Sequence, residues 1–186
     1  FILKEEKQHF ETGLKALNKL TSGKVYVGIS QRQPIDVKNA TSVIFDGPHP
    51  AGNVGIQINH IAPINKGDTV WTMSALDVLF IGRLFDKGIA DFSRIVAVTG
   101  SEIDDPHYVR TRIGASIASI TQGMVKAVEY EQRYISGNVL TGVKTNADGY
   151  IGATHSQITV IPEGNNYDEF LGWASLNPHK YSTSHS

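Results

Sequence analysis

The sequence predicts a mixed α/β fold in two consecutive parts, and three observations lead to that prediction. Residues 2–20 carry apolar side chains at helical spacing, and two short apolar runs at 24–29 and 42–45 are typical of strands. From Ser93 the pattern changes to two consecutive strands joined by a turn, as in a β-hairpin. Helix, strand, polar loop and strand is the order of an α/β unit. A chain of 186 residues has room for one large domain or two small ones, each with its own core.

The first predicted element is an amphipathic helix over residues 2–20. Charged residues occupy its other faces, and Thr21, Ser22 and Gly23 end it before the strand at 24–29. Its apolar face collects Leu3, Phe10, Leu14, Leu17 and Leu20.

A segment rich in glycine and proline follows the strand at 42–45 and occupies residues 46–64. Pro fixes φ and Gly permits positive φ, so the segment is predicted to be a shaped loop between strands. A glycine-rich loop after a strand is a place where α/β sheets approach phosphates and cofactors. Gly47, Gly52 and Gly55 fit neither G-x-G-x-x-G nor the phosphate-binding loop, so a purely structural turn stays open as the alternative.

A short strand at 68–73 and a long helix are predicted next. Ser74 is placed to cap the helix, with Asp77 three residues later as an imperfect capping box, and the helix runs from Ala75 to about Ala90. Its first half is apolar nearly all round, which favours burial. Four apolar residues could line a ligand pocket, but core packing is the preferred interpretation: Trp71, Met73, Phe80 and Phe85.

The second part is predicted to be a β-grasp unit, in which a hairpin is followed by a helix and further strands. The hairpin joins strands at 94–100 and 107–114 through an acidic turn at 101–106. A short helix carries Ile117, Ile120 and Met124, and a last clear strand covers 155–162. We therefore divide the chain into an α/β portion at 1–92, a β-grasp domain at 93–162 and an irregular segment at 163–186.

Composition excludes several classes of protein. The 17 Lys and Arg nearly balance the 18 Asp and Glu, so the broad positive field of a nucleic-acid binder is missing. The absence of cysteine excludes disulfide scaffolds, thiolate nucleophiles and iron–sulfur sites within this chain. No apolar run approaches the length of a transmembrane segment. The chain begins without Met, inside an amphipathic pattern, so we expect it to be a fragment of something larger.

The motif GPHPAG at 47–52, with Gly55, closely resembles the G-P-H-P-A-G-x-x-G signature of the NqrA family, whose members belong to the sodium-translocating NADH:quinone reductase. The resemblance continues in order and spacing over about residues 10–175. It includes the segments 70–71, 77–78, 81–85, 106–114, 135–142, 150–152 and 171–173. This is far more specific than any single motif.

The resemblance implies a peripheral subunit on the cytoplasmic face of the bacterial inner membrane, whose partners are the other subunits of the complex. The family is similar to RnfC and to the flavin- and NADH-binding subunit of respiratory complex I, which pair a Rossmann-like domain with a soluble-ligand-binding β-grasp (SLBB) domain. The glycine-rich and acidic segments that hold flavin and NADH in complex I are not recognisable here. The resemblance therefore implies that NAD, FMN and FAD belong to the whole complex, and that no cofactor is covalently bound here.

The candidate binding residues are Gly47, His49, Gly52 and Gly55. Backbone N–H groups of this loop could form an anion nest, and His49 could donate a hydrogen bond to a quinone carbonyl. His49 and His60 are eleven residues apart with no acidic pair at ligand spacing, so a metal site is not expected, and a satisfied loop histidine is the preferred alternative.

No catalytic residue is predicted, because the sequence contains neither a G-x-S-x-G elbow nor an identifiable Ser–His–Asp arrangement. Arg110 and Arg112 share a strand face and suit a solvated surface or an acidic partner. Glu102, Asp104 and Asp105 are predicted to form a hydrated turn.

The preferred hypothesis is a binding and assembly subunit of a sodium-pumping, quinone-reducing oxidoreductase, with quinone as a possible ligand and no catalysis by this chain alone. A flavin- or NADH-binding oxidoreductase subunit similar to that of complex I is the first alternative. A stand-alone β-grasp ligand-binding module is the second.

Overall fold

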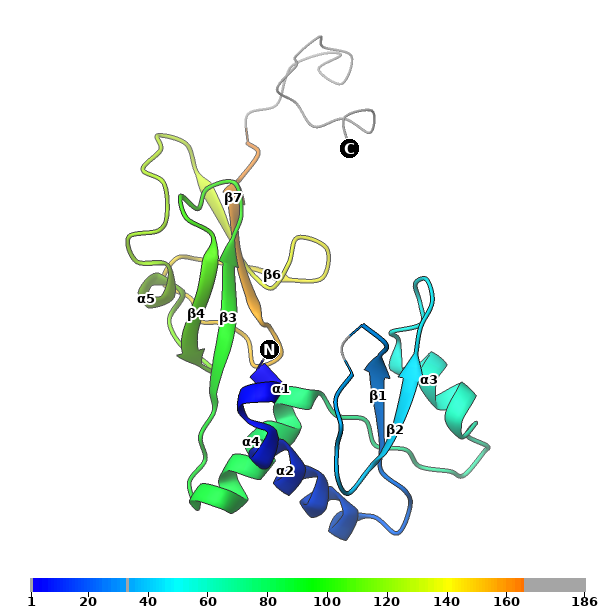
Figure 1. Cartoon of the computed structure of the whole chain (residues 1–186). Coiled ribbons are helices and arrows are strands. Elements are labelled where there is room, and N and C mark those ends of the chain that lie inside the picture. The colour runs from blue at the N-terminus through cyan, green and yellow to red at the C-terminus, as the bar shows by residue number, and fades with distance from the viewer. Residues whose placement is uncertain (1, 33, 166–186) are drawn as a thin grey trace. The chain divides into compact units, whose positions relative to one another are not determined.

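The computed structural model describes residues 2–32 and 34–165 (Figure 1). The chain divides into two compact units, residues 1–92 and 93–186. The first is an α/β unit and the second is a mixed sheet with one short helix, so the predicted α/β class is confirmed. Most of the predicted irregular segment at 163–186 lies outside the described residues, which end at Asn165.

The helices of the first unit are α1 (Ile2–Glu5), α2 (Lys7–Leu20), α3 (Val54–Ile61) and α4 (Ala75–Lys87), and its strands are β1 (Tyr26–Ser30) and β2 (Thr41–Phe45). The two strands are parallel, with Tyr26 opposite Thr41 and Ser30 opposite Phe45. The carboxyl ends of both strands therefore lie at the same edge of the sheet.

Helices α2 and α4 pack closely because each carries a glycine at the contact. A Cβ on Gly82 would lie 1.7 Å from the carbonyl oxygen of His9, and a Cβ on Gly13 would lie 2.2 Å from that of Val78. The core of this unit gathers around this contact and consists of Phe10, Leu14, Val37, Val78 and Leu79.

The predicted helix at Ala75 is confirmed with its capping box, because the Ser74 hydroxyl accepts from the Asp77 N–H and the Asp77 carboxylate accepts from the Ser74 N–H. It ends at Gly88, whose φ of 69° gives a left-handed C-cap. Gly88 thus stops the helix earlier than the predicted end near Ala90.

Two predictions for the first unit are wrong. The segment at 46–64 is not loop throughout, because α3 occupies Val54–Ile61, where no proline interrupts the backbone. The segment at 68–73 is not a strand. A strand needs a neighbouring strand for its backbone hydrogen bonds, and no described strand pairs with this segment.

The second unit contains β3 (Ser93–Thr99), β4 (His107–Arg112), α5 (Ile117–Thr121), β5 (Gln132–Ser136), β6 (Val143–Thr145) and β7 (Gln157–Pro162). The sheet order is β4-β3-β7-β5-β6, with β3 and β7 parallel and the other pairs antiparallel. The predicted β3–β4 hairpin and last strand are confirmed, and the predicted short helix forms but ends at Thr121, so Met124 lies beyond it. The core of this unit consists of Val96, Val98, Ile103, Ile117, Ile120, Ile151, Ile158 and Val160.

Candidate functional site

The glycine–proline loop, residues 46–53, leaves the carboxyl end of β2 and leads directly into α3 (Figure 1). Two backbone turns compact it: the Ala51 N–H donates to the Pro48 carbonyl at 3.0 Å, and the Asn53 N–H donates to the Pro50 carbonyl at 2.8 Å. Gly47 has a φ of 143°, which side chains rarely permit. The loop is therefore shaped by its own backbone.

The start of α3 leaves backbone donors open. The first intrahelical bond runs from the Gln57 N–H to the Asn53 carbonyl at 3.1 Å, so the N–H groups of Val54, Gly55 and Ile56 precede it. Asn53 forms no side-chain cap. Within residues 2–32 and 34–165 these three groups have no hydrogen-bond partner. A carbonyl or anionic oxygen could accept from them.

Gln57 ties α3 to the sheet and to the loop. Its side-chain Nε2 donates to the Ala51 carbonyl at 3.4 Å. A Cβ on Gly28 of β1 would lie 2.3 Å from its Oε1, so only glycine fits at position 28 with Gln57 in this place. Neither residue could be predicted from the sequence, because their contact joins positions 29 apart and carries no local signal.

The four predicted binding residues lie within one loop-and-helix segment. Gly47, His49 and Gly52 belong to the glycine–proline loop, Gly55 lies in the first turn of α3, and all four are exposed. A Cβ added at Gly52 or Gly55 would meet no atom within 4 Å, and neither has positive φ. The packing of the chain itself therefore does not require glycine at these two positions.

His49 is exposed and forms no hydrogen bond or ion pair with the described part of the chain. His60, in the last turn of α3, is also exposed. Among the described residues no group of three His, Cys, Asp or Glu side chains could hold a metal ion.

Of the four apolar residues considered for a pocket around α4, three are exposed and Phe80 is half-buried. Trp71 and Phe85 are 88% and 67% exposed, and Met73 is also exposed, so the preferred prediction of core packing is wrong for all three. Phe85 is exposed because α4 buries the face against α2, and Trp71 and Met73 precede that helix. Phe80 packs edge-on against Phe92 with ring centroids 5.6 Å apart.

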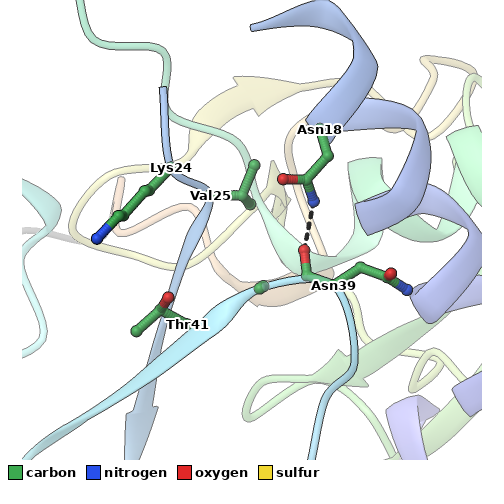
Figure 2. A pocket seen from close by; sticks show the side chains of 6 residues that line it. Asn18, Lys24, Val25, Asn39 and Thr41 are labelled. Carbon is green, nitrogen blue, oxygen red and sulfur yellow. Dashed lines mark hydrogen bonds between the residues drawn. The ribbon is translucent and has the colours of Figure 1, made fainter. Parts of the chain in front are cut away.

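A hollow of about 460 Å³ lies at the amino ends of β1 and β2, away from the glycine–proline loop (Figure 2). The Asn18 amide donates across it to the Asn39 carbonyl, as Figure 2 shows, and to the Leu14 carbonyl at 2.9 Å. Asn39 has a φ of 64°. Ligands of parallel sheets bind outside the carboxyl ends of the strands, so this hollow lies at the opposite end.

The packing of α2 on α4 is accompanied by a buried ion pair between Arg83 and Glu6, the N-cap residue of α2. Arg83 is 2% exposed, and its Nε and Nη2 donate to the two carboxylate oxygens of Glu6, each at 2.6 Å. This hydrogen bonding raises the pKa of the Arg83 guanidinium. His9 Nδ1 lies 2.5 Å from Asp86 Oδ2, and this hydrogen bond lowers the pKa of the Asp86 carboxyl. These groups stabilise the helix pair and lie outside the candidate site.

In the second unit the prediction of a hydrated acidic turn is wrong for Glu102. Glu102 is 3% exposed, and its carboxylate accepts from the Tyr130 hydroxyl at 2.8 Å and the Ser101 hydroxyl at 3.1 Å. The hydrogen bond to Glu102 raises the pKa of Tyr130. Asp104 and Asp105 are exposed as predicted.

A serine–histidine contact also occurs in the second unit. The Ser136 hydroxyl lies 2.8 Å from His155 Nδ1 and accepts from the Gly152 N–H at 2.9 Å. Ser136 is buried, and no acidic group of the described residues pairs with His155. Without an accessible hydroxyl or an orienting carboxylate, the pair is structural and not a nucleophile with its base.

Comparison with known families gives two adjacent matches. Residues 1–90 match the model of the NqrA second alpha/beta domain, and residues 95–147 match the model of the NQRA C-terminal domain. No described helix is both long and apolar enough to cross a bilayer.

Curated relatives match nearly the whole chain. They include the NqrA subunit of the Na(+)-translocating NADH-quinone reductase of Neisseria meningitidis serogroup C, 40% identical over 185 residues, and that of Hahella chejuensis, 42% identical over 188 residues. The same subunit of Yersinia pestis is 40% identical over 185 residues. Each alignment covers 97% of this chain and 41% of the relative, so the chain spans about two fifths of their length.

Proposed function

The chain belongs to the NqrA family, and on that premise we propose that it is part of the NqrA subunit of a sodium-translocating NADH:quinone reductase. In this role it assembles with the other subunits as a peripheral component at the cytoplasmic face of the bacterial inner membrane. It contributes a quinone-binding loop and no catalytic group. NAD, FMN and FAD are assigned to the rest of the complex.

The observation that carries the quinone proposal is that the packing of the chain requires glycine neither at position 52, in the loop, nor at position 55, in the first turn of α3. Glycine in a helix costs about 0.5–1 kcal/mol relative to alanine, and a Cβ at Gly55 would meet no atom of the chain. Close approach of another molecule to the backbone accounts for glycine at such a position. Gly52 fits the same account in the loop itself.

The chemistry of this segment matches a quinone headgroup, which is a flat apolar ring with two carbonyl oxygens. The open N–H groups of Val54, Gly55 and Ile56, and the ring of His49, are donors for a carbonyl oxygen. Val54 and Ile56 are exposed apolar side chains beside those donors. The ligand binds by hydrogen bonds and ring contact, and this segment supplies no group that could transfer electrons.

Tryptophan fluorescence during titration with a soluble ubiquinone analogue tests this proposal, with FMN and NADH titrated in parallel. Trp71 and Trp173 are the two tryptophans, and Trp71→Phe and Trp173→Phe assign any quenching. Saturable quenching by the quinone alone supports the proposal. Saturable binding of FMN or NADH contradicts it in favour of an oxidoreductase component that holds its own cofactor.

A further inference from the structure

Strand β4 forms one edge of the five-stranded sheet and carries a row of polar and aromatic side chains on its outer face. Val109 packs against the core, and side chains alternate along a strand. Tyr108, Arg110 and Arg112 therefore stand together on the face turned away from that core. All three are exposed, Tyr108 by 75%.

The residues of β3 beside the two arginines are not acidic. The residues opposite Arg110 and Arg112 on β3 are Ile95 and Ser93, and Ala97 is opposite Tyr108. Neither arginine forms an ion pair or a side-chain hydrogen bond with the described residues. Two positive charges about 7 Å apart on one strand repel each other, so carboxylates placed beside them would be favourable.

The backbone of β4 is also open on its outer side. The strand pairs with β3 only, among the strands that the structure describes. Beyond that ladder, the described chain uses one further backbone group of β4, the Arg112 carbonyl, which accepts from the Ala115 N–H at 3.2 Å. An edge strand with free N–H and C=O groups can accept an extended segment as an additional strand.

The charges along β4 determine where acidic and apolar residues of an added segment would lie. Asp104 and Asp105 are exposed just before β4, and the Asp105 carboxylate lies 3.5 Å from the His107 ring. They would repel an acidic group at that end of the strand. Carboxylates therefore belong beside Arg110 and Arg112, and an aromatic or aliphatic side chain belongs beside Tyr108.

We propose that β4 is a docking edge for an extended acidic segment of a partner protein. The segment adds as a strand next to β4, and directly opposite side chains in such a pair lie about 4.5–5.5 Å apart. In a segment that runs antiparallel to β4, the recognition pattern is two carboxylates separated by one residue, followed at the same spacing by an aromatic residue, because Tyr108 precedes both arginines. This inference concerns the second unit alone and does not depend on the quinone proposal.

Binding of synthetic peptides to the full chain, measured by fluorescence anisotropy, tests the proposal. The probe is a labelled, blocked heptapeptide with glutamate at its second and fourth positions and tyrosine at its sixth. One control peptide carries the glutamates at adjacent positions, and another carries N-methyl groups on the backbone nitrogens that would face β4. We expect saturable binding of the probe, weaker binding at higher salt, and at least about tenfold weaker binding of both controls.

Matched variants test the same contact from the protein side. The double variant Arg110→Glu/Arg112→Glu should weaken binding by about tenfold or more, because it replaces attraction by repulsion. Arg32→Glu changes the charge of another exposed arginine in the first unit and should leave the affinity unchanged. Circular dichroism of each variant checks that the fold is retained. If the double variant does not fold, the N-methylated peptide still tests strand addition, because it is measured on the unmodified chain.

Three results would overturn the proposal. Equal binding of the N-methylated peptide would mean that no strand is added. Binding of phosphatidylglycerol vesicles that depends on Arg110 and Arg112, with no peptide binding, would assign the face to a lipid surface. Absence of both interactions would leave β4 as an ordinary solvated edge.

Discussion

At the scale of single residues, the candidate site depends on glycines that the fold itself does not need. Gly55 and Gly82 make the contrast clear, since both lie in helices. A Cβ at Gly82 would collide with the His9 backbone, whereas one at Gly55 would project into open space. We assign Gly55 to the approach of a ligand and Gly82 to the packing of α2 on α4.

Alanine substitution at these two glycines should separate the two roles. Gly82→Ala should lower the free energy of unfolding by about 3 kcal/mol, because α2 and α4 must move apart. Gly55→Ala should leave stability unchanged or raise it by about 0.5–1 kcal/mol, since alanine is the better helix former. Urea denaturation measures both changes. A large loss of stability in Gly55→Ala would contradict this interpretation.

His49 provides a second residue-scale prediction. Removal of its ring in His49→Ala should weaken quinone binding by up to about tenfold, the value of one net hydrogen bond. The melting temperature should not change, because His49 is exposed and has no partner within the described chain. His60→Ala, at an exposed position near the end of α3, is the matched control. Unchanged quinone affinity in His49→Ala would remove this histidine from the site.

At the scale of elements, two ion-pair contacts hold neighbouring segments together. Glu6 joins the junction of α1 and α2 to α4 through Arg83. Glu163 follows β7 and accepts from Arg133 of β5 at 2.8 Å and from Lys144 of β6 at 2.6 Å. Each contact links residues far apart in the sequence.

Removal of the Glu6 carboxylate should destabilise the first unit strongly. In Glu6→Ala the Arg83 guanidinium stays buried and loses its bidentate partner, so the free energy of unfolding should fall by about 3 kcal/mol. This value is at the lower end for buried pairs because Asp91 Oδ1 lies 3.9 Å from Arg83 Nη1 and still offers a negative charge. Chemical denaturation followed by far-ultraviolet circular dichroism measures this change. Equal stability of Glu6→Ala and the unmodified chain would show that the pair contributes nothing to the helix packing.

Glu163 gives the chain a defined acid sensitivity. Hydrogen bonds from Arg133 and then Lys144 lower its pKa from 4.5 to about 2. Because the pKa of Glu163 is lower in the folded chain than in the unfolded chain, its ionised carboxylate stabilises the folded chain at pH values above about 4.5. This stabilisation is lost as the pH falls from about 4.5 to about 2. Glu163→Gln should therefore be less stable at neutral pH and should show a smaller loss of stability over that range. Identical pH profiles of the two proteins would refute this role.

The elements that sequence could predict are those with local signals. Ser74 and Asp77 cap α4, and Gly88 ends it, all within one short segment. Helix α3 was missed because its apolar residues Val54, Ile56 and Ile58 alternate as in a strand, and the neighbouring prolines suggested a loop. The burial of Glu102 was missed because its partner Tyr130 lies 28 residues away. Sequence periodicity carries no information on such contacts.

At the scale of the whole molecule, the family and the α/β class could be predicted from the sequence. The GPHPAG motif and the segments that follow it led to the NqrA family, and the matches at residues 1–90 and 95–147 confirm it. The loop that carries the candidate binding residues could also be chosen from the sequence, but the backbone donors proposed for the ligand could not. The N–H groups of Val54, Gly55 and Ile56 are open because the loop leads into a helix, and the sequence pattern did not predict that helix.

The central claim is that quinone binds where the glycine–proline loop meets α3. Amide hydrogen exchange of the full chain, with and without a saturating soluble ubiquinone analogue, tests it most directly. We predict slower exchange in residues 47–57, including the open N–H groups of Val54, Gly55 and Ile56, and no change around the hollow at Asn18 and Asn39. Protection that leaves residues 47–57 unchanged, or no protection at any residue, would contradict the claim.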